Sequence, residues 1–187
     1  MWLIRGLTSV ADLGGLLDDG RVRLEPLADH HLEPLRAACA EDSEIWQIYP
    51  VNMLGDDFDA ATRQFHETTS WVRYAVIDGA SGTCVGMTNF INPDAFGVVE
   101  IGGTFIVPRM RGSGFNRAMK ALMIGHAFAC GYRRIEFRVD TRNTRSMAAV
   151  EKLGAVREGT LRRNRVTWTG YIRDTAVFGL LREDWAG

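Results

Sequence analysis

The sequence has few cysteines, no long apolar run and no low-complexity tract. Its three cysteines, Cys39, Cys84 and Cys130, are widely separated and form no CxxC pair, so we expect neither a disulfide framework nor a zinc site. No stretch approaches the roughly 18 apolar residues that a membrane span needs, and the N-terminal MWLIRGLTSVADLGG lacks the apolar run and cleavage site of a secretory signal. These absences predict a cytoplasmic protein that neither spans a membrane nor needs a metal.

The length and composition are those of one globular domain. Of its 187 residues, 46% are hydrophobic and 24% are charged, which excludes collagen-like and disordered chains. We expect residues 1–20, with Gly14, Gly15 and an Asp18-Asp19-Gly20 turn, to be an N-terminal extension, and residues 21–187 to form the domain.

The charges are distributed unevenly along the chain. Residues 1–100 contain 6 Lys and Arg against 16 Asp and Glu, whereas residues 101–187 contain 16 against 7. Such asymmetry can indicate a charged ligand. Two interpretations stay open: the charges interleave in space, or the second half binds an anion while the first half helps to shape a site for a cation.

Hydrophobic periodicity predicts alternating strands and helices. We expect strands at residues 22–27, 71–78, 83–91, 98–107, 133–140, 155–161 and 173–181, and helices at residues 29–40, 59–71, 114–130 and 144–153. The stretch 42–58 is the least regular. This order predicts an α/β or α+β domain in which a mixed sheet carries helices on both faces.

A glycine-rich loop lies between an expected strand and the longest expected helix. It reads Arg109-Met110-Arg111-Gly112-Ser113-Gly114-Phe115-Asn116. Unpaired amides at a helix start attract anions, and glycines let those amides approach phosphate oxygens. The loop is not a Walker motif, and Arg117 stands where a dinucleotide fingerprint needs a small residue. Taken alone, it could equally be a tight turn with surface arginines.

The loop does not stand alone, because it resembles the acyl-CoA signature of the GNAT acetyltransferase superfamily at every position. That signature is Arg or Gln, two residues, Gly, one residue, then Gly or Ala. The resemblance covers nearly the whole chain from about Val22. The segments that carry it are VRLEPL, VEIGGTFIVP, GFNRAMKALMIGHAF, DTRNTRSMAAVEKLGAVREGTLR and RDTAVFGLLREDW. Asn143, Ser146 and the run Glu151-Lys152-Leu153-Gly154-Ala155 resemble the branch that includes the ribosomal-protein N-terminal acetyltransferases.

The resemblance implies a GNAT fold, with a mostly antiparallel sheet splayed at its centre, and acetyl-CoA as cosubstrate. It implies that Phe105, Ile106 and Val107 pair with the pantetheine arm and that the loop amides from Arg109 to Asn116 hold the pyrophosphate. Asn143 matches a position that commonly approaches the cofactor; its alternative role is the N-cap of the next helix. Asn116, Arg117 and Lys120 either reach the adenosine 3′-phosphate or are solvated helix charges.

The resemblance also implies acetyl transfer to a primary amine by direct attack in a ternary complex. We expect Glu100 to act as the base, directly or through water, although a strand glutamate is often only ion-paired. A backbone amide near Ile106 or Val107 would polarise the thioester oxygen. Ser146 is the candidate that protonates the leaving thiolate, although a serine there often only caps its helix. Many GNAT enzymes use a tyrosine for this step, and no tyrosine lies in this helix.

The acceptor is expected to be a peptide α-amine or a small-molecule amine. Trp46, Tyr49 and Trp71 lie where the specificity segment of the family falls, and they form either an acceptor pocket or an apolar wall. The four histidines are expected to be structural. The Arg162-Arg163-Asn164-Arg165 run is expected to form a hairpin turn, and its contact with nucleic acid is not favoured. A non-catalytic acyl-CoA-binding module stays open as an alternative, as does the choice between monomer and homodimer.

Overall fold

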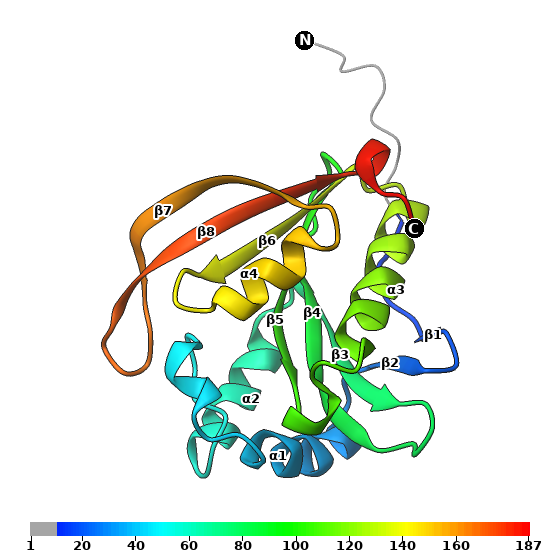
Figure 1. The fold of residues 1–187 in the computed structure, drawn as a ribbon. Coiled ribbons are helices and arrows are strands. Elements are labelled where there is room, and N and C mark those ends of the chain that lie inside the picture. The colour runs from blue at the N-terminus through cyan, green and yellow to red at the C-terminus, as the bar shows by residue number, and fades with distance from the viewer. Residues whose placement is uncertain (1–10) are drawn as a thin grey trace.

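A computed structural model of the chain describes residues 11–187, which fold around one eight-stranded sheet. The strands lie in the order β1-β2-β3-β4-β5-β6-β8-β7, and every neighbouring pair is antiparallel except β5 and β6 (Figure 1). Their bounds are β1 Leu17–Asp18, β2 Val22–Pro26, β3 Trp71–Asp78, β4 Cys84–Ile91, β5 Val98–Ile106, β6 Arg134–Asp140, β7 Val156–Val166 and β8 Ile172–Leu181. The predicted mixed, mostly antiparallel sheet is confirmed.

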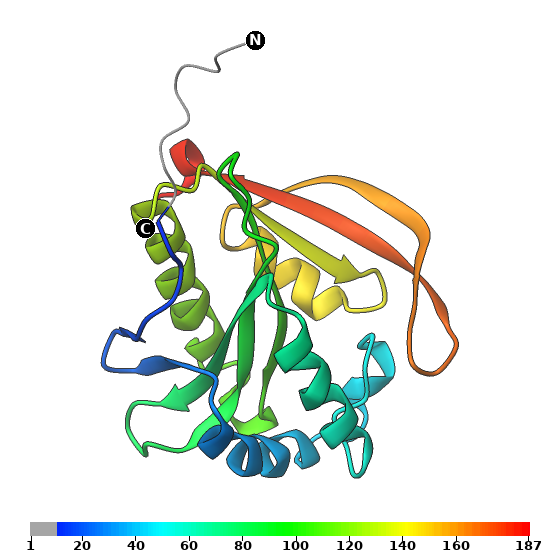
Figure 2. The ribbon, with the colours of Figure 1, turned by 180° about the vertical axis from the view of Figure 1, so that it is seen from behind.

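Helices cover both faces of the sheet, as the sequence predicted (Figures 1 and 2). The helices are α1 Leu32–Ala40, α2 Asp57–Glu67, α3 Phe115–Ala129 and α4 Thr144–Glu151. One face meets α1 and α2, and there Arg73 of β3 stacks on Phe65 of α2. The opposite face meets α3 and α4, and there Thr88 of β4 contacts Met123 of α3. Among the described helices, none is long and apolar enough to cross a bilayer.

The core follows from this double cover. Strand β4 is buried at all of its positions because helices cover both of its faces. Phe90 on β4 packs edge-on against Tyr74 on β3, while Phe105 on β5 packs against Trp46 beneath α1. Edge-to-face and tilted aromatic contacts of this kind add to the stabilisation that burial alone provides. The sheet therefore supplies a rigid platform for its central strands.

Two stretches differ from the expected organisation. Residues 11–20, expected in an extension, include strand β1 and the buried Leu13, whose carbonyl accepts a hydrogen bond from the Tyr74 hydroxyl. Residues 1–10 of that extension lie outside the described residues. The Arg162–Arg165 run, expected to form a hairpin turn, continues strand β7, and that prediction was wrong. A β-bulge there, with Arg163 at φ 51, keeps β7 paired with β8 as far as Val166.

The sheet opens at its centre. Parallel strands β5 and β6 pair only from Val98 to Glu100 and from Arg134 to Glu136, and beyond Glu100 the two strands diverge. Strand β6 then pairs with β8 alone, and β5 with β4 alone. The predicted splayed centre is thus confirmed, and it leaves one edge of β5 without a neighbouring strand.

A β-bulge in β5 accompanies this opening. The register between β4 and β5 shifts between Met87 and Asn89, where Gly103 and Thr104 together face one residue of β4. Gly103 has φ 56, and a Cβ on it would lie 2.5 Å from the side-chain nitrogen Nδ2 of Asn89, so glycine is the residue that fits here. That amide donates to the carbonyls of Gly102 and Gly103, at 3.1 and 3.3 Å, and so holds the bulge in place.

A buried lysine supports the bulge from the opposite face. Lys120 on α3 is only 6% exposed, and its Nζ donates to Thr104 Oγ1 at 2.5 Å and to Thr88 Oγ1 at 3.4 Å. Its expected alternative role as a solvated helix charge was therefore wrong. Burial lowers the pKa of Lys120 to about 7, because the charged form loses its hydration, while Glu100 nearby acts in the opposite direction.

This burial predicts a pH-dependent stability. Between pH 7 and 10.5 the unfolded chain binds a proton at Lys120 that the folded chain does not, so the unfolding free energy should rise with pH in that window. From pH 7 to pH 10, the unfolding free energy of the wild type should rise by about 3 kcal/mol relative to that of Lys120→Met. Denaturant unfolding at several pH values measures this difference. Lys152→Met, at an exposed lysine, is the control and should follow the wild type; parallel profiles for all three proteins would contradict the assignment.

Candidate functional site

The glycine-rich loop presents a group of unpaired amides at the start of α3. Gly112 and Gly114 adopt φ values of 76 and 85, which L-residues rarely adopt, so the backbone there turns without side chains in the way. Within the described chain, no hydrogen bond to protein is made by the amides of Gly112, Ser113, Gly114, Asn116 and Arg117. The Phe115 amide is bonded to Ser113 Oγ at 3.3 Å. These free donors at a positive helix end fit a diphosphate.

The loop arginines are already paired with acidic residues of the first half of the chain. Arg109 bonds to Glu41, and Arg111 bonds to Asp42 Oδ2 at 2.5 Å and to the Ile106 carbonyl at 3.1 and 2.9 Å. Both guanidinium groups are thereby turned toward carboxylates. The half-buried Met110 packs against the core. The side chains of Arg109 and Arg111 are therefore engaged with protein partners, and the unpaired donors of the loop are its backbone amides.

The open edge of β5 carries backbone groups that alternate in direction. The Val107 amide donates to the Val85 carbonyl at 2.9 Å, so it faces β4 and is occupied. Successive amides of a strand point to opposite sides, so the Ile106 amide faces the open edge. On that edge the Thr104 carbonyl accepts a hydrogen bond from the Tyr49 hydroxyl. Of the two amides considered from the sequence, Ile106 is therefore the one placed to polarise an acyl oxygen, while Phe105 is buried in the core.

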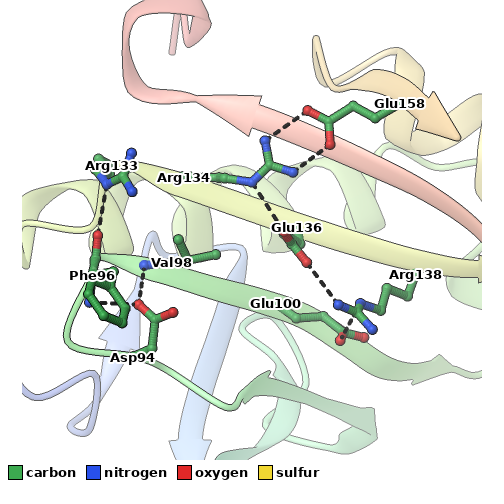
Figure 3. A network of polar contacts seen from close by, with 9 residues as sticks. All are labelled: Asp94, Phe96, Val98, Glu100, Arg133, Arg134, Glu136, Arg138 and Glu158. Carbon is green, nitrogen blue, oxygen red and sulfur yellow. Dashed lines mark hydrogen bonds and ion pairs between the residues drawn. The ribbon is translucent and has the colours of Figure 1, made fainter.

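Glu100 lies where the two strands part. Its side chain is 16% exposed and lies 3.5 Å from Arg138 Nε, in a ladder that continues through Glu136 and Arg134 to Glu158 (Figure 3). Burial raises the pKa of Glu100 and outweighs the opposite effect of Arg138, so the carboxylate is a stronger base than an ordinary glutamate. Glu100 thus stands next to the open edge as a carboxylate of raised pKa, which makes it a candidate to accept a proton.

The residues at the start of α4 cap that helix. The Asn143 side chain accepts a hydrogen bond from the Ser146 amide at 3.0 Å, so the N-cap role of Asn143 is confirmed. Ser146 is half-buried in the first turn of α4. Their contacts with a cofactor and with a leaving thiolate stay predictions.

The structure separates the three aromatic residues expected in the acceptor pocket. Trp46 is fully buried, and its indole N–H donates to the Cys39 carbonyl at 3.2 Å, so it is core beneath the site and does not line it. Trp71 stands over a separate cavity of about 290 Å³ together with Phe65 and Arg73. Tyr49 alone reaches the open edge of β5, and burial raises its pKa to about 12, so its hydroxyl stays protonated.

One cluster outside this region resembles a metal site but is already satisfied. Glu25, His30 and His31 hold their ligand atoms within 4.8 Å of one another. His31 Nδ1 accepts from the Ala28 amide at 3.1 Å, and its Nε2 therefore carries the proton that it shares with Glu25 at 3.0 Å. Both ring nitrogens are occupied, which agrees with the structural role expected for His31.

Several residues around Glu100 escaped sequence reasoning. Thr104 and Lys120 are joined by a hydrogen bond at the β-bulge of β5, and the hydrophobic periodicity of the sequence does not reveal a bulge. Arg138 alternates with apolar residues in a strand and so looked like an ordinary solvent-facing charge. The positive charges of Arg165 and Arg173 oppose the rise in the pKa of Glu100, so both residues lie near it. They are brought there by the pairing of β6, β8 and β7.

Comparison with known proteins gives a family. A family model described as an acetyltransferase (GNAT) domain matches residues 21–156, whereas comparison with curated proteins finds no match. A GNAT-family structure from Chromobacterium violaceum ATCC 12472 has a TM-score of 0.90 and 28% identity, covering 100% of this chain and 96% of that one.

Two more distant structures share the fold. Spermidine N-acetyltransferase from Vibrio cholerae, in complex with CoA and spermine, has a TM-score of 0.73 and 18% identity, covering 90% of this chain and 100% of that one. Ribosomal-protein-S5-alanine acetyltransferase from Vibrio fischeri has a TM-score of 0.72 and 16% identity, covering 93% and 100%. With its family model matched over most of its length, its splayed sheet and its amide-lined loop, the chain belongs to the GNAT acetyltransferase family, whose cosubstrate is acetyl-CoA.

Proposed function

We propose that this protein transfers the acetyl group of acetyl-CoA to a primary amine by direct attack in a ternary complex. The observation that carries the proposal is the course of β5. This one strand presents a buried carboxylate at Glu100, a backbone edge without a neighbouring strand after it, and a loop of free amides at its end. In this proposal the cosubstrate and the base are both positioned by β5, and a strand holds reacting groups more precisely than a loop does.

Each part of the site has a role in this reaction. The amides from Gly112 to Arg117 hold the diphosphate, the edge of β5 aligns the pantetheine arm, and acetyl-CoA supplies the activated acetyl group. The amine nitrogen bonds to the acetyl carbon, the carbon–sulfur bond breaks, Glu100 takes a proton from the amine, and the thiolate takes up a proton. The Ile106 amide stabilises the oxyanion as it forms.

The proton for the thiolate has two candidate donors on this chain. Ser146 stands at the start of α4, where the family resemblance pointed, and Tyr49 holds a protonated hydroxyl at the open edge of β5. Tyr49→Phe and Ser146→Ala separate them, since the variant that loses the donor loses turnover while its affinity for CoA persists.

A peptide α-amine and a small-molecule amine both fit a weak base of this kind. An α-amino group titrates at about 7.7–8.0 and therefore has a neutral fraction at neutral pH, so it needs little help from Glu100 to lose its proton. A lysine-like or polyamine nitrogen titrates near 10.4 and needs more assistance. Release of free thiol from acetyl-CoA, with a panel of amines and N-terminal peptides, distinguishes these acceptors. A module that only binds acyl-CoA would release none.

The positive φ of Gly112 sets the direction of the loop amides. Gly112→Ala should weaken CoA binding about tenfold, because an alanine at positive φ shifts the backbone that aims the amides. Gly82→Ala is a matched control, since Gly82 has φ 69 in the exposed turn between β3 and β4. Both variants should lose similar stability, and only the first should lose affinity in calorimetric titration with CoA. Equal affinities would show that CoA does not use this loop.

Glu100 is the proposed base, and its carboxylate can be removed without changing the size of the side chain. Glu100→Gln should lower kcat by about 10² to 10³, with affinity for acetyl-CoA within a factor of two of the wild type. In the wild type, kcat/KM should fall as pH drops through the raised pKa of Glu100, and this acid limb should disappear in the variant. Glu158→Gln, at an exposed carboxylate of the same ladder, is the control. Undiminished turnover in Glu100→Gln would remove Glu100 from the reaction.

A further inference from the structure

Strand register aligns six charged residues on the sheet face that Glu100 occupies. Glu100 pairs with Glu136, and Arg138 and Asp140 follow on the same side of β6. Asp140 pairs with Thr175, two residues from Arg173 on β8, and Arg173 pairs with Arg165 on β7. We call these six residues the charged face: Glu100, Glu136, Arg138, Asp140, Arg165 and Arg173.

A local distortion places Arg165 there. The register between β7 and β8 shifts between Leu161 and Arg165, and this bulge is held by Asp174, whose Oδ1 accepts from the Arg163 amide at 2.7 Å. Thr175 Oγ1 donates to Asn164 Oδ1 at 2.6 Å, which fixes the bulge from the other side. Bulges commonly re-aim side chains next to functional sites.

Every carboxylate of the charged face already has an arginine partner. Glu100 and Glu136 pair with Arg138, at 3.5 and 3.2 Å. Asp140 accepts from the backbone and guanidinium of Arg142, at 2.8 to 3.0 Å through both of its oxygens. Arg165 and Arg173 are left over: among the described residues neither forms an ion pair, although Asp140 and Glu100 act on Arg173 from a greater distance.

Arg173 is an unusual arginine. It is only 5% exposed, and its Nε donates to Thr175 Oγ1 at 3.1 Å. Within residues 11–187, its two terminal nitrogens have neither a hydrogen bond nor an ion pair, although they are not sealed from solvent. Burial lowers the pKa of Arg173, because a guanidinium group loses hydration there. A buried guanidinium without an anion is costly, and the fork of its terminal nitrogens matches a carboxylate.

We propose that Arg173 and Arg165 bind a carboxylate of the acceptor, so that the acceptor is an amine that also carries a carboxylate several ångströms away. This inference rests on the proposed function, because Glu100 marks where the amine reacts. A polyamine would place its second cation against two guanidinium groups and is disfavoured. The carboxylate could belong to an amino acid or to an acidic side chain near a peptide N-terminus.

The register also limits the length of the acceptor. Along the backbone, Asp140 lies four residues beyond Glu136, which is roughly 13 Å. Arg173 bonds to Thr175 opposite Asp140, and the Glu100 carboxylate extends toward Arg138, which shortens the gap that an acceptor has to span. An α-carboxylate is too close to its own amine to reach both groups. The favoured acceptor therefore has its amine and carboxylate separated by a chain of several carbons.

The test compares acceptors that differ only at the far end. Thiol release is measured with glycine, 4-aminobutyrate and 6-aminohexanoate against α,ω-diamines of the same lengths. A second arm uses the tripeptide amides Ala-Glu-Ala, Ala-Gln-Ala and Ala-Lys-Ala. If the natural acceptor is an amino acid, the amino acids should exceed the diamines at least tenfold in kcat/KM, and this advantage should grow with chain length. If the natural acceptor is a peptide, Ala-Glu-Ala should have the highest kcat/KM of the three tripeptide amides. Diamines or Ala-Lys-Ala as the best acceptors would overturn the inference while the proposed function stands.

Variants assign the effect to the two arginines. Arg173→Gln should raise KM for the best carboxylate acceptor at least tenfold, leave kcat within threefold, and leave the uncharged amide analogue unaffected. Arg157→Gln removes the same charge from the opposite face of β7 and should change nothing. Should Arg173→Gln fail to fold, Arg165→Gln at an exposed position should raise the same KM several-fold. An unchanged KM in Arg165→Gln and in a folded Arg173→Gln overturns the inference.

A binding measurement keeps the two proposals separate. N-acetyl-6-aminohexanoate and its carboxamide are titrated calorimetrically into the CoA-saturated protein, which requires no turnover. Tighter binding of the carboxylate, lost in Arg165→Gln, supports the inference even when no acceptor is acetylated. Equal affinity for both probes overturns it.

Discussion

The parting of β5 from β6 after Glu100 is the constraint on which the rest of the site depends. A parallel pair that continued to Ile106 would consume the backbone groups of β5 in sheet hydrogen bonds and leave none for a ligand. The bulge at Gly103 and Thr104 accompanies the change of course, and Asn89 holds it with two hydrogen bonds. The bulge requires a glycine at one position and an amide side chain on the neighbouring strand, so a small local motif supports the geometry of a whole strand edge.

The uneven charge distribution is partly explained by this geometry, which supports the interleaving of charges in space, whereas the binding of an anion by the second half stays a prediction. Glu41 and Asp42, from the acidic first half, neutralise Arg109 and Arg111 of the basic second half, so charges do interleave in space. The arginines of β8 and β7 are different, because the carboxylates near them are already paired with Arg138 and Arg142. Two arginines that lack an ion-pair partner among the described residues, Arg165 and Arg173, therefore lie on the charged face and not at the loop where a motif search would look for them.

Sequence reasoning succeeds where one element decides the outcome. The alternating pattern of β6 depends only on local periodicity, and the strand expected at residues 133–140 is confirmed as Arg134–Asp140. Sequence reasoning fails where a contact between two segments that are distant in the sequence determines the position of a side chain. Nothing in the helical pattern around Lys120 reveals that Thr88 and Thr104 will receive its ammonium group, and nothing in the arginine run of β7 reveals that Asp174 will hold a bulge there. Trp46 illustrates the same limit, since its burial follows from packing against Phe105, which lies 59 residues later in the sequence.

The charged face also depends on a contact at the tip of the β7–β8 hairpin, which extends away from the sheet toward the turn Ile45–Ile48 (Figures 1 and 2). All eleven residues of β7 are exposed, so pairing with β8 alone would leave this edge strand free to bend. The Trp168 indole N–H donates to the Trp46 carbonyl at 2.7 Å and ties the tip to a residue that is itself fully buried. Arg165 stands three residues before Trp168, between this anchor and the bulge held by Asp174. A side chain fixed at both ends in this way keeps its position relative to Arg173, and a rigid pair of guanidinium groups can select an acceptor by length as well as by charge.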